Sequence, residues 1–339
     1  MAKAEKLKSG NWRAKAYMGT DENGKKIFQS FTAATKKEAE YLAAEAVVKK
    51  KEKVKNMTVG EAIDKYISIK ENVLSPTTIY GYRKIRQCYL QMLMDLPIQK
   101  LTQETVQKAV NDEAKRLAAK TVKSAHGLLS AALSIYRPEL RLKTTLPRVQ
   151  KKYKDLPQPS EIIQMVTGTP IELPVLLALM CGMRMSEIKG IRKKDIDGEC
   201  LTIQNVVVRV ERQDIAKENT KTQNSARRLK LPRRILDLID EIEVKSPDDY
   251  IIPVSGSVIY KRFIRLIEKN GLKRMTFHDL RHLNASVMLM LGIPDKYAME
   301  RGGWATDNIL KSVYQHTFSD EREAVDQRIE DYFDNISKK

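Results

Sequence analysis

The chain has 339 residues and is 42% hydrophobic, which is enough for two or three domains that each bury a core. Its 61 Lys and Arg residues outnumber 43 Asp and Glu residues, and the net charge of +18 favours a polyanionic partner such as nucleic acid, a ribosome or an anionic membrane surface. The sequence has no bilayer-length apolar run, no signal-peptide core and only three widely spaced cysteines, so we expect no membrane partner and a reducing compartment.

Residues 1–55 have the pattern of a small sheet followed by a helix. Trp12–Tyr17 and Ile27–Phe31 alternate in polarity like strands, and Asn23-Gly24 between them is typical of a hairpin turn. A lone hairpin is marginally stable, so we expect a third short strand within the first ten residues. Thr35 begins a capping box that starts the helix. Such a basic ribbon can enter a DNA major groove, although its lysines can also serve only to solvate a small domain.

Residues 56–150 predict an all-α domain of four helices. Thr58, Ser75 and Thr102 are N-cap residues that start the first three helices, and the fourth spans 121–136. The lysines and arginines of these helices can either line a groove that contacts DNA phosphates or act as ordinary solvated charges.

The next segment, 141–159, is basic and contains several prolines, which predicts an extended linker between domains. Residues 155–339 then mix helices with strands. The run 174–181 is apolar nearly all round, so we expect a buried helix that ends at the following glycine. Residues 200–210 and 226–231 have the β-branched composition of strands.

A histidine and an arginine lie three residues apart near the start of a predicted helix. At that spacing His278 and Arg281 share one helix face, where a guanidinium fork and an imidazole can bind one phosphate. The alternative is that His278 caps or packs the helix and Arg281 is a surface charge.

Four further polar positions stand out along the same region. Arg184 follows the buried helix and its glycine turn, with Glu187 one turn later to hold the guanidinium. Lys221 lies in a polar turn, Trp304 follows two glycines in a loop, and Tyr314 lies on another predicted helix. Each position alone has an ordinary structural explanation, and the order of the whole set is what makes it specific.

In this order and local context, the set resembles the tyrosine recombinases, or phage-type integrases, over about residues 155–318. The motifs are CGMRMSEI, NTKTQNSARRLKLP, HDLRH, GGW and YQH, and the matching residues are Arg184, Lys221, His278, Arg281, Trp304 and Tyr314. Many members have histidine where Trp304 stands. Tryptophan keeps one N–H donor for a phosphate, but it cannot serve in acid–base catalysis at that position.

The resemblance implies a multidomain, mainly α fold with small β-sheets. Residues 1–55 would be a three-stranded sheet plus a helix, an arm-type DNA-binding domain like that of some phage and conjugative-transposon integrases. Residues 56–150 would be a helical-bundle domain that binds core-type sites. Residues 155–339 would be the α+β catalytic domain, with a C-terminal helix at 320–337.

The resemblance also implies a reaction, which is site-specific recombination that integrates and excises a mobile element or prophage. Tyr314 would attack the scissile phosphorus and form a 3′-phosphotyrosyl link, and Lys221 would protonate the departing 5′ oxygen. The two arginines, the histidine and the tryptophan would stabilise the charge that builds on the phosphate. We expect no cofactor and no metal, since no suitable carboxylate cluster is apparent.

The expected partner is double-stranded DNA, at core-type and arm-type sites, in the bacterial cytoplasm. The family further implies a homotetramer on paired sites, in which C-terminal helices exchange between protomers, and DNA-bending or directionality helper proteins. Three alternatives remain open at this point. They are a type IB topoisomerase-like relaxing enzyme, a non-catalytic DNA-binding regulator and a metal-dependent nuclease.

Overall fold

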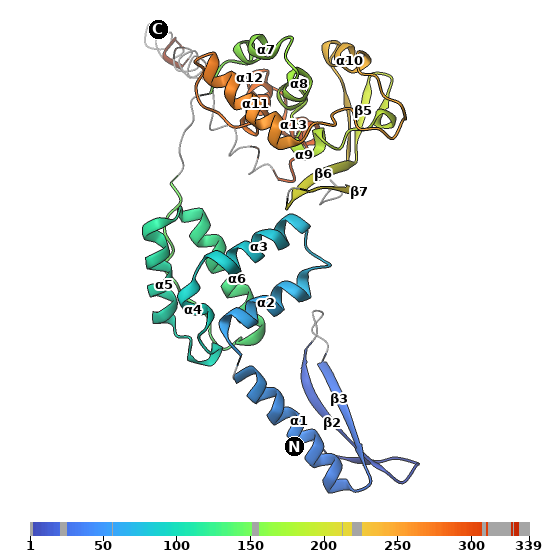
Figure 1. Cartoon of the computed structure of the whole chain (residues 1–339), viewed down its shortest axis with the longest axis vertical. Coiled ribbons are helices and arrows are strands. Elements are labelled where there is room, and N and C mark those ends of the chain that lie inside the picture. The colour runs from blue at the N-terminus through green and yellow to red at the C-terminus, as the bar shows by residue number, and fades with distance from the viewer. Residues whose placement is uncertain are drawn as a thin grey trace, which may run out of the picture. The chain divides into compact units, whose positions relative to one another are not determined.

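A computed structural model gives the fold of most of the chain. It describes residues 3–20, 26–55, 57–150, 156–211, 213–218, 226–306, 310, 327 and 329–331. The chain divides into two compact units, Met1–Gln150 and Lys151–Lys339, each of which is considered by itself (Figure 1). No helix in the described ranges is long and apolar enough to cross a membrane. The predicted turn at 23–24 and most of the predicted C-terminal helix lie outside the described residues.

The first block of the N-terminal unit is a sheet packed on one helix, as the sequence predicts. Its strands pair antiparallel in the order β1-β2-β3, and they are β1 (Glu5–Lys6), β2 (Trp12–Thr20) and β3 (Lys26–Ala33). Helix α1 (Lys36–Lys55) lies against the sheet, where Ala14 and Ala16 of β2 are buried with Ala39 and Ala43 of the helix. These small side chains let the helix approach the strands closely. The expected third short strand is therefore confirmed.

A helical bundle with its own hydrophobic core follows. Its helices are α2 (Val59–Lys70), α3 (Pro76–Cys88), α4 (Gln91–Met94), η1 (Ile98–Lys100), α5 (Gln103–Arg116) and α6 (Ala119–Tyr136). The three predicted N-caps are confirmed, because the side chains of Thr58, Ser75 and Thr102 each accept a hydrogen bond from a backbone N–H three residues later. The four predicted helices are present, and the short elements α4 and η1 were not predicted.

The first part of the segment predicted to be an extended linker is bound to this bundle. The side-chain oxygens of Gln103 and Gln107, one turn apart on α5, accept hydrogen bonds from the backbone N–H groups of Lys143 and Thr145 at 2.8 and 2.9 Å. Nε2 of Gln107 also donates to the Thr145 carbonyl at 3.1 Å. Leucines 140, 142 and 146 pack against the helical core. We call this arrangement of Gln103, Gln107 and residues 140–146 the α5 clasp. Residues 141–150 contain no helix or strand, in agreement with the predicted linker, but their attachment to the bundle was not predicted.

Removing the clasp's second glutamine tests this attachment. Gln107→Ala deletes two hydrogen bonds to one residue, each contributing about 1 kcal/mol, so the Thr145 amide is expected to exchange with solvent about tenfold faster or more. Hydrogen exchange followed by mass spectrometry measures this. Lys108→Ala is the matched control, because Lys108 lies beside Gln107 and forms an ion pair with the exposed Glu104. Unchanged exchange at Thr145 in Gln107→Ala would mean that the glutamine does not hold the segment.

The C-terminal unit is built around the buried helix α8. Its helices are α7 (Pro159–Val166), α8 (Glu172–Cys181), α9 (Met185–Ile188), η2 (Lys193–Asp195), α10 (Arg233–Asp240), α11 (Gly256–Lys269), α12 (Asp279–Met290) and α13 (Asp295–Gly302). Helix α12 packs against α8 (Figure 1). The observed mixture of helices and small antiparallel sheets confirms the predicted mainly α fold.

Two small sheets cover part of this unit. Their strands are β4 (Ile196–Asp197), β5 (Cys200–Ile203), β6 (Asn205–Val210), β7 (Gln213–Glu218) and β8 (Arg227–Lys230). The first sheet has the order β4-β5-β8 and the second pairs β6 with β7, all antiparallel. The strand structure predicted at 200–210 is confirmed, but this range holds two strands, β5 and β6. The two strands are separated at Gln204, whose side-chain amide donates to Asp195 at 3.0 Å. Strand β5 pairs with β4 and β8, whereas β6 pairs with β7.

Candidate active site

The end of helix α8 forms the first part of the site. Gly182 ends the helix with a φ of +63°, which favours glycine, and a Cβ atom there would lie 2.6 Å from Oδ1 of Asn284. The Gly182 carbonyl accepts a hydrogen bond from Nη1 of Arg281, a residue 99 positions away. The glycine therefore ends a buried helix and also receives the second arginine of the site.

Arg184 follows this turn as the N-cap residue of α9. Its Nη1 donates to Oε1 of Glu187 at 2.6 Å, its backbone N–H donates to Oε2 at 3.0 Å, and its Nη2 donates to the Gly303 carbonyl at 3.0 Å. The Arg184 side chain is 37% exposed and that of Glu187 is 2% exposed. A buried carboxylate thus holds an accessible guanidinium in one orientation, and the expected contact between the two residues is confirmed.

A third arginine, which the sequence analysis missed, enters the same network from β8. The Nη2 and Nη1 atoms of Arg227 donate to Oε2 and Oε1 of Glu187 at 2.9 and 3.3 Å, and its Nε donates to the Arg301 carbonyl at 2.9 Å. Arg227 is buried, in the same inward register as Leu229 of that strand. An arginine at a core-facing strand position is a sequence signal that could have singled out Arg227, since such a charge needs a buried partner, but it does not identify that partner.

Arg281 is the most deeply buried cation of the site, with only 2% of the residue exposed. Its guanidinium carbon lies 4.2 Å from the centre of the Trp304 ring, and its Nη2 has no hydrogen-bond partner among the described residues. Burial, followed by the charge of Arg184, lowers the pKa of Arg281 to about 9, although Glu187 acts in the opposite direction. The guanidinium therefore remains charged at pH 7, and the described residues accept only part of its hydrogen bonds.

His278 lies one turn before Arg281, at the N-cap position of α12 with helical backbone angles. Its side chain is exposed to solvent, and its ring meets that of His282 edge to face, with centroids 4.9 Å apart. The helix start is fixed by Asp279, whose Oδ2 accepts hydrogen bonds from the backbone N–H and the hydroxyl of Thr276. The imidazole is therefore accessible to solvent one helical turn before Arg281, as the phosphate-binding interpretation requires.

The two glycines before Trp304 have separate steric roles. A Cβ atom on Gly302 would lie 1.9 Å from the indole ring, so this glycine lets Trp304 fold back over the helix end. Gly303 has a φ of +65°, and a Cβ atom there would lie 2.8 Å from Nη1 of Arg227. The Trp304 residue as a whole is 6% exposed. The expected loop position of Trp304 is confirmed, whereas its burial and its stacking on Arg281 were not predicted.

The structure thus brings together two of the predicted arginines and the tryptophan, with the histidine one helical turn away. Lys221 and Tyr314 lie outside the described residues, so their roles remain predictions. Within the described ranges, no group of three or more His, Cys, Asp or Glu side chains is placed to hold a metal ion.

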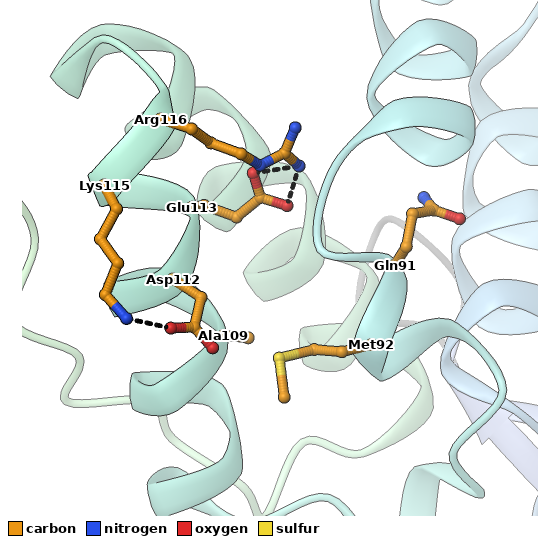
Figure 2. A pocket seen from close by; sticks show the side chains of 7 residues that line it. All are labelled: Gln91, Met92, Ala109, Asp112, Glu113, Lys115 and Arg116. Atoms are coloured by element: carbon orange, nitrogen blue, oxygen red, sulfur yellow. Dashed lines mark hydrogen bonds and ion pairs between the residues drawn. The ribbon is translucent and has the colours of Figure 1, made fainter.

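A pocket of about 480 Å³ lies elsewhere, in the helical bundle (Figure 2). It is lined by α4 and α5, and both of its cationic side chains are paired, Arg116 with Glu113 and Lys115 with Asp112. Glu113 also accepts a hydrogen bond from the backbone N–H of Leu90 at 2.8 Å. Since these charges are already compensated, the pocket is poorly suited to bind phosphate.

Comparison with known proteins gives consistent matches. Residues 154–321 match the family described as the Phage integrase family. A protein described as tyrosine recombinase XerC-like, from Caldanaerobacter subterraneus subsp. tengcongensis, is 22% identical and the match covers 98% of this chain and 99% of the relative. An integrase of Staphylococcus phage L54a is 25% identical, with 44% of this chain and 49% of the relative covered.

Solved structures share the fold. A Tn1549 transposon integrase in complex with DNA has a TM-score of 0.65 at 17% identity, covering 80% of this chain and 99% of that one. A lambda integrase dimer bound to a core site has a TM-score of 0.60 at 18% identity, covering 93% and 95%. The glycine turn before Arg184, the His-Arg pair and the stacked tryptophan all lie within the residues that match the family, and a recombinase relative matches the chain from end to end. The chain therefore belongs to the phage integrase family and is a tyrosine recombinase.

Proposed function

We propose that this enzyme integrates and excises a mobile element or prophage by cutting and rejoining DNA strands through a 3′-phosphotyrosyl intermediate. The observation that carries the proposal is the state of Arg281. It is buried, charged at pH 7 and lacks a hydrogen-bond partner for Nη2 among the described residues, and it lies within the electrostatic reach of Arg184. Two guanidiniums held in this way suit a phosphodiester, whose two nonbridging oxygens accept pairs of hydrogen bonds.

The proposed role of these cations is to stabilise the transition state. As the attacking oxygen approaches phosphorus, negative charge grows on the nonbridging oxygens, and donors fixed in advance stabilise that charge without having to reorganise. Arg184 is fixed by Glu187 and Arg281 by Gly182 and Trp304. His278 and the Trp304 N–H would supply further donors to the same phosphate.

The proposed chemistry needs two more groups, Tyr314 and Lys221. The phenolic oxygen of Tyr314 would bond to phosphorus as the bond to the 5′ oxygen breaks, and its proton would pass to His278. The leaving 5′ oxygen would take a proton from Lys221. Attack by the 5′ hydroxyl of another strand on the phosphotyrosine would then rejoin the DNA and release the tyrosine, so no ATP is needed.

We further propose two DNA-binding domains, at residues 1–55 for arm-type sites and 56–150 for core-type sites. In support, Lys15 and Tyr17 alternate with the buried Ala14 and Ala16 and so lie on the sheet face opposite α1. The Tyr17 ring packs against Phe28 of β3, with centroids 5.6 Å apart. An exposed face with cationic and aromatic side chains suits a DNA groove.

The proposed assembly is a homotetramer on paired sites, with the C-terminal helix at 320–337 exchanged between protomers. A solved relative, lambda integrase, is described as a tetramer bound to a Holliday junction. The proposal includes DNA-bending or directionality helper proteins and places the enzyme in the bacterial cytoplasm. The topoisomerase-like, regulatory and nuclease alternatives are not favoured, because the relative that matches end to end is described as a recombinase.

Trapping on a nicked suicide DNA substrate tests the proposal. The nick lets a short fragment diffuse away after cleavage, so the enzyme is expected to accumulate as a covalent adduct, and peptide mapping should find the DNA on Tyr314. Chelator should leave the yield unchanged, and strands from two different DNA molecules should be joined. No adduct, an adduct on another residue, or loss of activity with chelator would contradict the proposal.

A further inference from the structure

A buried ion pair lies behind the proposed phosphate-binding arginines and has no assigned role. Arg227 and Glu187 are paired at 2.9 Å with only 4% and 2% of their side chains exposed. Both carboxylate oxygens of Glu187 are engaged by Arg227, and Oε1 is also engaged by Arg184. Two segments 40 positions apart in the sequence, α9 with its N-cap residue and the start of β8, therefore meet at this carboxylate.

The carboxylate creates an electrostatic difficulty for phosphate binding. Glu187 is needed to orient Arg184, but a negative charge 2.6 Å from that guanidinium also repels the phosphate that Arg184 is proposed to bind. Because the pair is buried, solvent screens this repulsion only weakly. A second cation on the same carboxylate removes the difficulty, since it offsets the negative charge and leaves the hydrogen bonds to Arg184 in place.

The protonation state of Glu187 agrees with this role. Burial by itself raises the pKa of Glu187, but the hydrogen bond and charge of Arg227, followed by the charge and backbone N–H of Arg184, hold it below its ordinary value. The carboxyl is therefore ionised at pH 7, and Arg227 contributes more to this than Arg184 does. Among the described residues, the charged groups that act on Glu187 are Arg184 at the start of α9, Arg227 on β8 and Arg281 on α12.

We propose that Arg227 is a positioning residue for the recombination reaction. It offsets the negative charge of Glu187, so that Glu187 can hold Arg184 in place without weakening the attraction of Arg184 for the scissile phosphate. The inference rests on the proposed function of Arg184 and Arg281. Arg227 acts through Glu187 and does not itself touch the DNA. It also begins the strand that follows the segment containing Lys221, and it binds the carbonyl of Arg301 just before the loop that carries Trp304.

The test is a double-mutant cycle measured as single-turnover adduct formation on the nicked DNA, with DNA affinity and melting temperature recorded for each variant. Arg227→Met is expected to slow adduct formation about 100-fold, with melting temperature as a separate readout of folding. Arg228→Met is the matched control, because the neighbouring Arg228 carries the same charge in an exposed pair with Asp197. Its adduct rate should stay within about threefold of wild type.

Two comparisons separate charge neutralisation from a purely structural role. In Arg227→Met, Glu187 loses its main stabiliser and its pKa rises, so the rate relative to wild type should recover as pH is lowered and the carboxyl takes up a proton. In a Glu187→Gln background no negative charge needs neutralising, and adding Arg227→Met should slow the reaction by only about threefold. If Arg227→Met alone does not fold, this second comparison does not need it, because the double variant leaves neither partner of the pair buried with an unmatched charge. Glu187→Gln keeps one side-chain oxygen that can accept from Arg227, and its melting temperature shows whether it folds.

A loss that is equal at every pH, or a loss of about 100-fold in the Glu187→Gln background as well, would overturn the inference. A wild-type rate for Arg227→Met would also overturn it. Failure of the proposed function looks different, because then the wild-type enzyme itself forms no adduct on the nicked DNA.

Discussion

The Tyr314→Phe variant is expected to bind core-site DNA with wild-type affinity and to form no covalent adduct with it. The substitution removes one oxygen atom and leaves every lysine and arginine unchanged, so electrostatic binding to DNA should persist. Without the phenolic oxygen no bond to phosphorus can form, and strand cleavage should fall by about 10⁴-fold or more. Denaturing electrophoresis of the nicked-substrate reaction measures the adduct, and a gel-shift titration measures affinity.

The control for this experiment is a second tyrosine in the same unit. Tyr297 lies on α13 and is 63% exposed, so Tyr297→Phe removes the same hydroxyl group from a site with no assigned chemistry. It should cleave at the wild-type rate. An adduct formed by Tyr314→Phe would falsify the nucleophile assignment. Loss of cleavage in Tyr297→Phe would mean that the nucleophile has been assigned to the wrong tyrosine.

The features that were predicted correctly depend on residues close together in the chain. The caps at Thr58 and Thr102 need only a hydroxyl and a backbone N–H three residues later, so the local sequence is enough to predict them. The buried helix ending at Gly182 is likewise readable, because an apolar run and a glycine are adjacent. The same locality explains why the His-Arg pair at the start of α12 was found.

The features that were missed depend on partners far away in sequence. Arg227 contacts Glu187 across 40 positions and the Arg301 carbonyl across 74, and the sequence around Arg227 identifies neither partner. The α5 clasp joins Gln107 to Thr145 across 38 positions. The basic, proline-containing composition of 141–159 indicated a linker, and its leucines were therefore not recognised as packing residues. The pairing of β6 with β7 was missed because β7 is polar and shows no strand composition.

A second large effect is expected at Arg281. Arg281→Met keeps an unbranched side chain of similar length but removes the charge and the donors, and adduct formation should fall by about 10³-fold or more. The reason is that Arg281 is held by Gly182 and Trp304 with Nη2 left for a phosphate oxygen, so its contribution is greatest when charge grows on that oxygen. Arg274→Met is the control, since Arg274 is an exposed arginine just before the same helix.

A binding measurement shows whether this loss comes from the proposed contact. The pKa of Arg281 is lowered to about 9 by burial and by Arg184, so burying the charged guanidinium on folding is unfavourable and a bound anion relieves that penalty. Inorganic phosphate should therefore raise the melting temperature of the wild-type protein more than that of Arg281→Met, with a shift that grows with concentration as RT ln(1 + [L]/Kd). Equal shifts in both proteins would place the anion elsewhere. The loss of cleavage in Arg281→Met would then reflect a damaged pocket and not a missing phosphate contact.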